Sequence, residues 1–566
     1  MFSRVPKRRR QAAPGPPKAP LRRRLRLLLT YAALQLRHIS WMSVDRSFER
    51  RLARLVNGRS GGALQGGLKG VEKESLRVTP RGRIAQTPHP KALGSPLTHE
   101  HVTTDYSEAL IELVTPPFAE TWELTQYLCD LHQFVYRNLD EELLWATSMP
   151  CAIEGDASIP IAEYGSSNVG RMKTVYRRGL GLRYGRVMQA IAGVHFNYSF
   201  PEHFWPVLAD LCESRDAGQD FRSESYFALL RNYRRHGWIV LYLFGNSPAL
   251  CPSFLGGRRV DWLQPLEPGT VYAPHATSLR MSDLGYRNAS QAGLSVSVNS
   301  LAHYVRDLTA AITTPHAEYQ KFGVKVDGEY VQLNANLLQI ENEYYSFIRP
   351  KRVANSGERP TQALRRGGVQ YVEMRSLDVS AFDPVGVNQN KLRFLEAFAA
   401  YCVLGASPPI EVAEQSELDG NHARVAREGR KPGLKLRRGG RDVDLHDWAL
   451  EIVDGMRGVC ELLDGDDLQR PYTTALDAQA AKVHEPSLTP SARTLLEMRT
   501  SGESFFNFAL RMSAVHKGYF LELHSPNEAL QEEFVREAEE SLREQSRVED
   551  SDTLDFDQYL ARYFAA

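Results

Sequence analysis

The chain has 566 residues, of which 42% are hydrophobic and 24% are charged, and its formal net charge is +1. This length exceeds a typical single domain, and the apolar content indicates a globular protein with a large core. No run reaches eighteen apolar residues, which excludes a membrane-spanning helix. A net charge near zero gives no guide to binding partners.

The positive charge gathers at the N-terminus. Residues 1–41 contain eleven Lys or Arg and no Asp or Glu, so the remaining residues carry a net charge of −10. This segment fits a basic anchor for nucleic acid or anionic lipid, a transit peptide, or a disordered extension upstream of Met42 as the true start. Four prolines between positions 14 and 20 favour the disordered extension.

The cysteines are few and far apart. None of the six belongs to a CxxC pair, which argues against a disulfide scaffold or a zinc site and favours a reducing, cytoplasmic location. The sequence leaves open a single redox-regulating disulfide among the six cysteines. The cysteines are Cys129, Cys151, Cys212, Cys251, Cys402 and Cys460.

The first predicted elements of the folded part are a helix over 46–56 and, after a glycine-rich break, a strand over 71–78. Glu72 and Glu74 share one face of that strand, because side chains two residues apart point the same way. Apolar residues at helical spacing predict a helix over 122–144.

Two later strands carry polar side chains. Residues 189–200 alternate between polar and aromatic side chains, which predicts a strand whose polar face, with His195, lines a cavity. Residues 369–377 form a further predicted strand, with Glu373 and Arg375 on one side.

Most of the other predicted elements are helices. The Asp327-Gly328 pair predicts a hairpin over 324–343. Helices are expected over 223–244, 301–311, 388–403, 445–463, 491–501, 503–515 and 527–547, the last one charged as in a solvated surface helix. The strands lack βαβ spacing, so we expect an α+β fold with a mainly antiparallel sheet.

Acidic residues in short motifs indicate a metal site. Two carboxylates about 4 Å apart repel by ~4 kcal/mol at an effective dielectric constant near 20, and Mg²⁺ or Mn²⁺ would reverse that cost. For any single acidic residue, the alternative to a metal ligand is a side chain that is exposed to solvent or paired with Lys or Arg. Glu112, which lies in an apolar run, argues against exposure. For His195 the alternative is a core histidine bonded to a backbone carbonyl.

Several arginines suit carboxylate or phosphate groups, which planar guanidinium groups bind in bidentate fashion. They are Arg177, Arg280 and Arg375, and residues 348–352 add a basic turn. The chain contains no GxxxxGK[ST] motif and no GxGxxG motif after a strand, so a nucleotide would not be held by a P-loop.

The motifs together resemble the proteobacterial glutamate–cysteine ligase family, the γ-glutamylcysteine synthetases. Ten segments match in family order over about residues 60–520. The most specific are Gly70-Val71-Glu72-Lys73-Glu74, Thr103-Thr104-Asp105, Ile111-Glu112-Leu113-Val114-Thr115-Pro116, Gly193-Val194-His195-Phe196-Asn197-Tyr198-Ser199 and Glu373-Met374-Arg375-Ser376-Leu377.

The resemblance implies a fold and a domain organisation. The fold is related to glutamine synthetase and the guanidino kinases, with an antiparallel sheet curled into a funnel and helices outside. We expect a basic extension over 1–41, a catalytic domain over 42–525 and a charged helical tail over 526–566.

The resemblance also implies roles for particular residues. The magnesium-binding positions are Glu72, Glu74, Asp105, Glu112, His195 and Glu373. The cysteine pocket is lined by Tyr176, Leu180, Gln189, Ile191 and Tyr286. Arg177 lies near a substrate carboxylate, and Arg280 and Arg375 are the catalytic arginines. Lys73, where a relative has arginine, points outward.

The reaction implied is ATP-dependent ligation of the γ-carboxyl of L-glutamate to L-cysteine through a γ-glutamyl phosphate, the first step of glutathione synthesis. Mg²⁺ is the expected metal, with Mn²⁺ as its substitute, and glutathione is the expected feedback inhibitor. We expect a cytoplasmic monomer without nucleic acid. The alternatives are a related carboxylate–amine ligase with another amine acceptor, or a binder of nucleic acid or membrane surfaces through residues 1–41.

Overall fold

The structure is a computed structural model that describes residues 46–58, 60–285, 294–355, 357–523 and 527–565. The basic segment 1–41 and Tyr286 lie outside the described residues. Residues 47–566 group into one compact unit, whose fold is given below.

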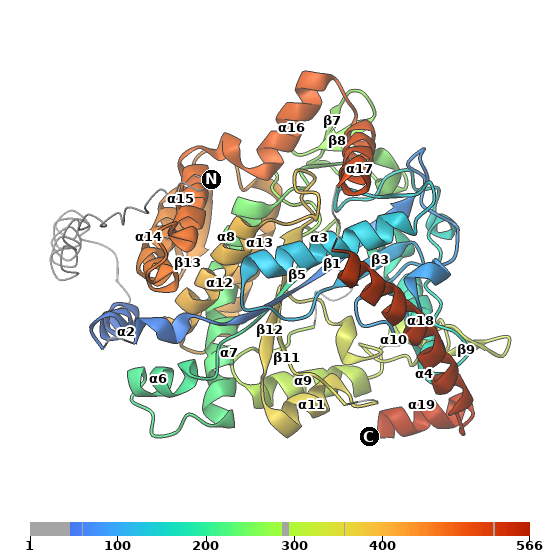
Figure 1. Ribbon diagram of the computed structural model, residues 1–566, viewed down its shortest axis with the longest axis horizontal. Helices are drawn as coiled ribbons and strands as arrows, with labels where there is room; N and C mark the ends of the chain where they lie inside the picture. Colours follow the sequence, from blue (N-terminus) through green and yellow to red (C-terminus); the bar gives the residue numbers. More distant parts are fainter. Residues whose placement is uncertain (1–45, 59, 286–293, 356, 524–526, 566) are drawn as a thin grey trace, which may run out of the picture. The chain divides into compact units, whose positions relative to one another are not determined.

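An antiparallel sheet, seven-stranded within the described residues, lies at the centre of this unit (Figure 1). The strand order is β11-β12-β5-β1-β3-β2, and β4 pairs with β1. The strands are β1 (Leu68–Val78), β2 (Val102–Thr104), β3 (Leu110–Val114), β4 (Leu143–Leu144), β5 (Gly193–Ser199), β11 (Ile348–Lys351) and β12 (Tyr371–Asp378). The α+β prediction with a mainly antiparallel sheet is confirmed.

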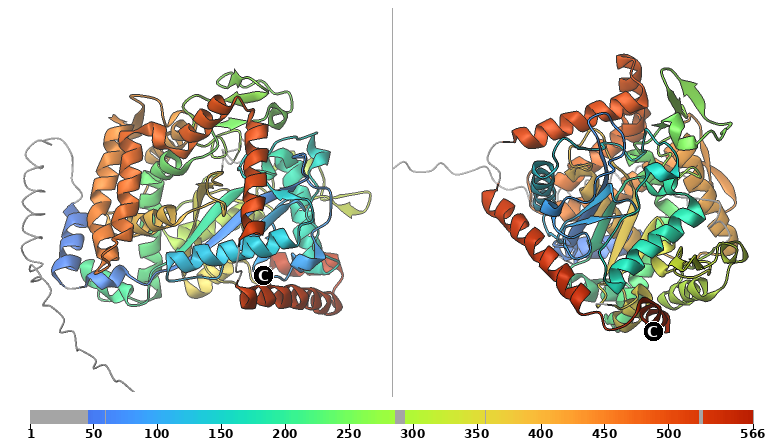
Figure 2. Two further views of the ribbon diagram at one scale, coloured as in Figure 1. Left: turned by 45° about the horizontal axis from the view of Figure 1, so that its top comes forward. Right: turned by 90° about the vertical axis from the view of Figure 1, so that its right-hand side faces the viewer.

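Helices surround the sheet (Figure 2), and α3 lies across its central strands with α18 beside it (Figure 1). The helices are α2 (Arg46–Asn57), α3 (Thr121–Arg137), α4 (Asn168–Tyr184), α5 (Arg186–Gln189), α6 (Phe204–Leu211), α7 (Gln219–His236), α8 (Trp238–Phe244), α9 (Leu301–Thr313), α10 (Ala317–Gln320), α11 (Pro360–Gly367), α12 (Gln389–Leu404), α13 (Val412–Glu428), α14 (Leu445–Asp464), α15 (Pro471–His484), α16 (Pro490–Ser501), α17 (Phe505–Glu522), α18 (Glu528–Asp550) and α19 (Phe556–Ala565). Among the described residues, no helix is long and apolar enough to span a bilayer.

Among the described residues, short strands outside the central sheet form antiparallel pairs and one three-stranded antiparallel sheet. The strands are β6 (Ala249–Leu250), β7 (Gln264–Leu266), β8 (Thr270–Tyr272), β9 (Lys325–Val326), β10 (Glu329–Tyr330), β13 (Lys435–Arg438) and β14 (Arg441–Asp444). The pairs are β9–β10 and β13–β14, and the strand order of the small sheet is β6-β8-β7. The predicted Asp327-Gly328 turn joins β9 to β10, with φ of 51° and 86°, as two-residue hairpin turns require. The remainder of the predicted hairpin does not form strands.

Several predicted boundaries were wrong. The helix over 122–144 ends at Arg137, because the chain then turns to form β4. The helix over 223–244 divides at Gly237, where an added Cβ would lie 2.5 Å from the Tyr233 carbonyl oxygen. The basic turn over 348–352 is strand β11, paired with β12.

One disulfide joins Cys151 to Cys251, as the sequence left open. The four remaining cysteines, all within the described residues, are free.

The face of β1 that points away from the glutamates is buried against helices. Lys73 on that face is 3% exposed, so the predicted outward position is wrong, and burial lowers its pKa to about 7. On the same face Lys69 Nζ lies 2.9 Å from Glu396 Oε2 of α12, and both side chains are 1% exposed. The Tyr472 hydroxyl of α15 donates to the same carboxylate. This polar cluster fixes α12 and α15 to the sheet.

We expect Lys69→Met to lower the free energy of unfolding by roughly 3–5 kcal/mol, because it leaves the Glu396 carboxylate buried without its partner. Thermal unfolding of the full chain measures the change. The double variant Lys69→Met/Glu396→Leu should recover much of the loss, and the exposed Arg543→Ala is the control. Equal stability of the single variant and the parent would contradict this assignment.

Candidate active site

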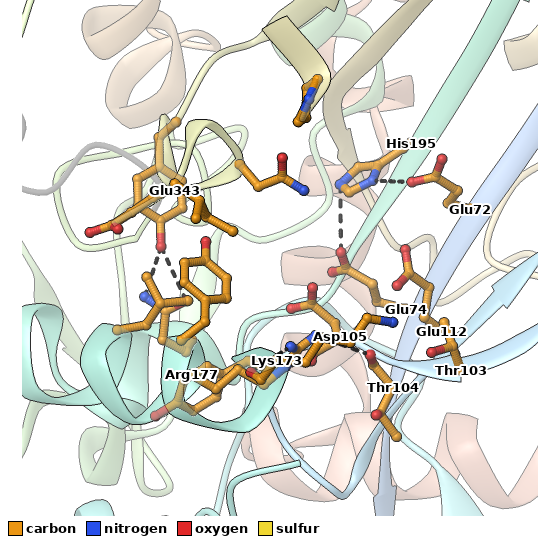
Figure 3. Close-up of a pocket in the computed structure, with 18 of the residues that line it drawn as sticks. Glu72, Glu74, Thr103, Thr104, Asp105, Glu112, Lys173, Arg177, His195 and Glu343 are labelled. Carbon is orange, nitrogen blue, oxygen red and sulfur yellow. Dashed lines mark hydrogen bonds and ion pairs between the residues drawn. The ribbon is translucent and has the colours of Figure 1, made fainter. Parts of the chain in front are cut away.

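A cavity of about 540 Å³ opens on the other face of the sheet (Figure 3). Its walls include β1, β2, β3, β5, β11 and β12 of the sheet, one side of α4, and parts of α5 and α19. Helix α4 begins after Ser167, whose hydroxyl accepts a hydrogen bond from the Gly170 N–H, and ends at Gly185 with φ of 82°. The sheet and this helix therefore bring distant parts of the chain to one pocket.

Strand pairing brings the predicted metal ligands together. Glu72 on β1 is paired with His195 on β5, and Glu74 is paired with Glu112 on β3. Side chains at such paired positions have Cβ atoms about 4.5–5.5 Å apart. Asp105 follows β2 and joins the same cavity.

The His195 ring lies between two glutamates (Figure 3). Its Nδ1 is 3.0 Å from Glu72 Oε2, and its Nε2 is 3.5 Å from Glu74 Oε1 and has no hydrogen-bond partner. Ligand atoms of Glu72, Glu112 and His195 all lie within 4.8 Å of one another. Oxygen-rich donors at this spacing, beside a buried imidazole nitrogen without a hydrogen bond, fit a divalent cation.

The electrostatics of these carboxylates differ with their neighbours. Burial raises the pKa of Glu74 to about 8, with Asp105 contributing, and burial and Glu72 raise the pKa of Glu112 well above its usual value. Burial also acts on Glu373, but Lys351 at 3.4 Å and Arg375 at 3.2 Å hold its pKa well below the usual range. The cluster is therefore costly to ionise unless positive charge is close.

Arg375 and Arg280 stand at the edge of the acidic cluster. Arg375 pairs with Glu373, and its backbone carbonyl accepts a hydrogen bond of 3.1 Å from Arg280 Nη2. Arg280 is 2% exposed and lies 4.0 Å from Asp378. It also lies against Gly193, where an added Cβ would come within 2.0 Å of Arg280 Nη2. The Arg280 guanidinium can occupy this position because Gly193 has no side chain.

Arg177 also lines the cavity, but its hydrogen bonds go to backbone carbonyls. Its Nε donates to the Asp105 carbonyl, and its Nη1 donates to the Lys173 carbonyl at 3.0 Å. The guanidinium also lies 4.5 Å from the centre of the Tyr164 ring. These contacts hold the end of β2 against α4, so the side chain has a structural role whatever else it binds.

The predicted cysteine pocket is assembled from α4 and the segment before β5. Tyr176 and Leu180 lie one turn apart on α4, and Gln189 and Ile191 complete the wall. Gln189 lies in α5 and not in the predicted strand, and its Nε2 donates to the Tyr345 hydroxyl at 2.7 Å. Tyr286 lies outside the described residues, so its predicted place stays a prediction.

Sequence reasoning missed several lining residues. Spacing of three and four residues along α4 could have predicted Met172 and Lys173 beside Tyr176. Arg349 and Lys351 were predicted to lie in a turn. Because they lie in strand β11, two residues apart, their side chains share one face of the strand and both line the cavity. No local signal in the charged C-terminal segment indicated that Tyr559 and Tyr563 of α19 reach the same cavity.

Clustered carboxylates with flanking guanidinium groups in one cavity are an arrangement typical of an enzyme active site. Comparisons with known proteins give the family. Residues 52–425 match the family profile described as glutamate-cysteine ligase, and the chain belongs to the glutamate–cysteine ligase family. It is therefore a ligase.

Relatives in this family are similar along most of their length. The glutamate–cysteine ligase of Pseudomonas putida is 50% identical over 499 residues, 88% of this chain and 95% of the relative. That of Alcanivorax borkumensis is 48% identical over 521 residues, 91% and 99% of the two chains. A solved Francisella tularensis glutamate–cysteine ligase in complex with AMP has a TM-score of 0.83 and 35% identity, covering 88% of this chain and 98% of its own.

The close approach at Gly193 predicts the effect of adding one methyl group. Gly193→Ala should displace the Arg280 guanidinium and lower turnover on the order of a hundredfold, the cost of misplacing a group by about 1 Å. Steady-state kinetics measure this. Gly420→Ala, where no atom lies within 4 Å of the added Cβ, is the matched control. Normal turnover of Gly193→Ala would exclude a catalytic position for Arg280.

Proposed function

We propose that the protein joins the γ-carboxyl group of L-glutamate to the amine of L-cysteine, with ATP converted to ADP and phosphate. The observation that carries this proposal is the acidic cluster with Arg280 and Arg375 at its edge, in a chain of the glutamate–cysteine ligase family. The product is γ-glutamylcysteine, the first intermediate of glutathione synthesis.

The activation step explains why the pocket needs concentrated positive charge. A carboxylate is a poor acyl donor, and transfer of the γ-phosphoryl group of ATP to its oxygen creates a leaving group. Phosphoryl transfer asks the protein mainly for positioning and for neutralisation of charge. In this proposal the guanidinium groups of Arg375 and Arg280 orient the transferred group and neutralise its oxygens.

The divalent cation is proposed to be Mg²⁺, with Mn²⁺ as its substitute. Glu72, Glu74, Asp105, Glu112, His195 and Glu373 would hold it. When bound, the cation neutralises phosphate oxygens and the crowded carboxylates. Lys351 and Arg375, which keep Glu373 ionised, would preserve this residue as an anionic ligand.

The second step is attack of the cysteine amine on the acyl phosphate, which releases phosphate. The tetrahedral intermediate carries its negative charge on the former carbonyl oxygen, which requires positively charged donors, and Arg375 is proposed to supply them. Tyr176, Leu180, Gln189, Ile191 and Tyr286 are proposed to surround the cysteine side chain. An apolar pocket separates similar side chains by only ~1–3 kcal/mol, so 2-aminobutyrate should be accepted in part.

Arg177 is proposed to face a substrate carboxylate from the cavity wall, and the sheet to share the funnel of the glutamine synthetase and guanidino kinase folds. The catalytic domain is proposed to span 42–525, and the charged helical segment 526–566 is proposed to complete the wall of its cavity through Tyr559 and Tyr563. A cytoplasmic location is proposed from the four free cysteines, and the Cys151–Cys251 disulfide is the observation against it. A monomeric state and feedback inhibition by glutathione complete the proposal.

Release of ADP by the purified full chain tests the reaction. We expect steady-state release to require glutamate, cysteine, ATP and a divalent cation, and to fall to background when any one is omitted. Glutamate, ATP and the cation form the acyl phosphate, and cysteine must consume it before the next turnover. A coupled ADP assay makes the measurement. Ammonia, glycine and alanine serve as alternative amines, and faster turnover with one of them would assign a different amine acceptor.

The planar guanidinium group of Arg375 is the basis of a second prediction. Arg375→Lys keeps the charge but loses bidentate geometry, so turnover should fall about a hundredfold, as for loss of one oxyanion donor. Steady-state kinetics with saturating substrates measure the change. Arg178→Lys is the matched control, because Arg178 is 44% exposed and outside the lining of the cavity. Parental kinetics for Arg375→Lys would remove the case for bidentate contact.

A further inference from the structure

The C-terminal helix α19 forms part of the cavity wall, although it lies beyond the residues that match the family profile. Tyr559 and Tyr563, four residues apart and therefore on one side of the helix, both line the cavity. Figure 1 shows α19 at the end of the chain, close to α4.

Independent contacts hold α19 in this position. Phe556 and Leu560 are buried in a small apolar cluster with Met172 and Val175 of α4 and with Ile340. Asp557 accepts hydrogen bonds from Lys325 Nζ at 2.8 Å and from the Tyr330 hydroxyl at 2.6 Å, both on the β9–β10 hairpin. The tyrosine pair is therefore fixed on the side of the cavity.

The cavity beside α19 differs in chemistry from the rest of the cavity. Beside α19 the cavity is lined by Met172, Ile340, Tyr559 and Tyr563, which belong to or pack on one apolar cluster. The charges of Glu341 and Arg359 reach Tyr563. The apolar and aromatic surfaces themselves offer few hydrogen-bond partners to the α-amino and α-carboxylate groups of glutamate and cysteine. A flat, uncharged heteroaromatic ring suits these surfaces, because aromatic side chains stack on bases.

The position along α4 agrees with this chemistry. Met172, beside α19, and Leu180, in the predicted cysteine pocket, are eight residues apart, or about 12 Å of helix. Lys173 and Arg177 lie between these two positions and line the cavity. The negative charge of Glu112 favours the charged form of Lys173, so this part of α4 lies near the acidic cluster. An extended nucleotide with its phosphates at the acidic cluster would place its base toward α19, away from the cysteine pocket.

We propose that Tyr559 and Tyr563 of α19 form the wall on which the purine base of the nucleotide stacks. This inference rests on the proposed function, which supplies ATP as a substrate. It makes the C-terminal helix a nucleotide-binding part of the active site, and the charged C-terminal segment then serves to position these two rings.

Binding of ADP to the full chain tests the inference. Tyr559→Ala and Tyr563→Ala should each raise the Kd for ADP and the KM for ATP about tenfold, equivalent to ~1.4 kcal/mol, as expected for one base–aromatic stack. The KM values for glutamate and cysteine should change by less than about twofold, because uniform loss of nucleotide binding leaves other subsites intact. Calorimetry and steady-state kinetics make the measurements.

Matched variants separate stacking from support of the fold. Tyr563→Phe keeps the flat ring and should bind ADP as the parent does. Arg562→Ala, exposed on the same helix, should leave all constants unchanged. If an alanine variant fails to fold, Tyr563→Leu keeps apolar volume without a planar ring and should weaken ADP binding in the same way.

Two results would overturn the inference. One is an unchanged Kd for ADP in the folded alanine or leucine variants, and the other is a rise in the KM for glutamate or cysteine without a change for ATP. Calorimetry with ADP does not need ligase turnover. A chain that bound ADP through these tyrosines but failed to join glutamate to cysteine would overturn the proposed function and leave the inference standing.

Discussion

Crowding of carboxylates on one face of a buried sheet is the constraint on which the rest of the site depends. Pairing of β1 with β3 and β5 fixes Glu72, Glu74, Glu112 and His195 side by side, so none can move away without breaking the strand register. The raised pKa values of Glu74 and Glu112 express the cost of this arrangement. Because a bound cation would offset the repulsion between these buried carboxylates, the cluster is suited to a cation.

The opposite face of the same strands supplies the rigidity that the crowded face needs. Lys69 and Glu396 are paired and almost fully buried there, and Lys73 is also buried. A buried ion pair contributes little net stability over an apolar pair, but each partner makes the other indispensable. The pair thus fixes α12 against β1 in one position, and the sheet holds its register beneath the cavity.

Much of the site could be predicted because its signals are local. The alternation in β1 places Glu72 and Glu74 on one face, and the same rule places His195 on the polar side of β5. Positions that depend on tertiary contacts could not be derived in this way. Arg349 and Lys351 became part of a strand only through pairing with β12, and α19 reaches the cavity through apolar contacts with α4, far away in sequence.

Charge balance in the cavity links the protein to its proposed substrates. Among the described residues that line it, seven are acidic and six are Lys or Arg, so the fully ionised wall is close to neutral. The two signs are distributed unevenly. Four of the acids lie on or next to β1, β2 and β3, namely Glu72, Glu74, Asp105 and Glu112, whereas Lys351 and Arg375 lie on β11 and β12 beside Glu373. A near-neutral cavity cannot take up a nucleotide triphosphate and glutamate without additional cations, because their negative charges would be buried beside carboxylates. Metal binding and nucleotide binding are therefore expected to be coupled in this pocket.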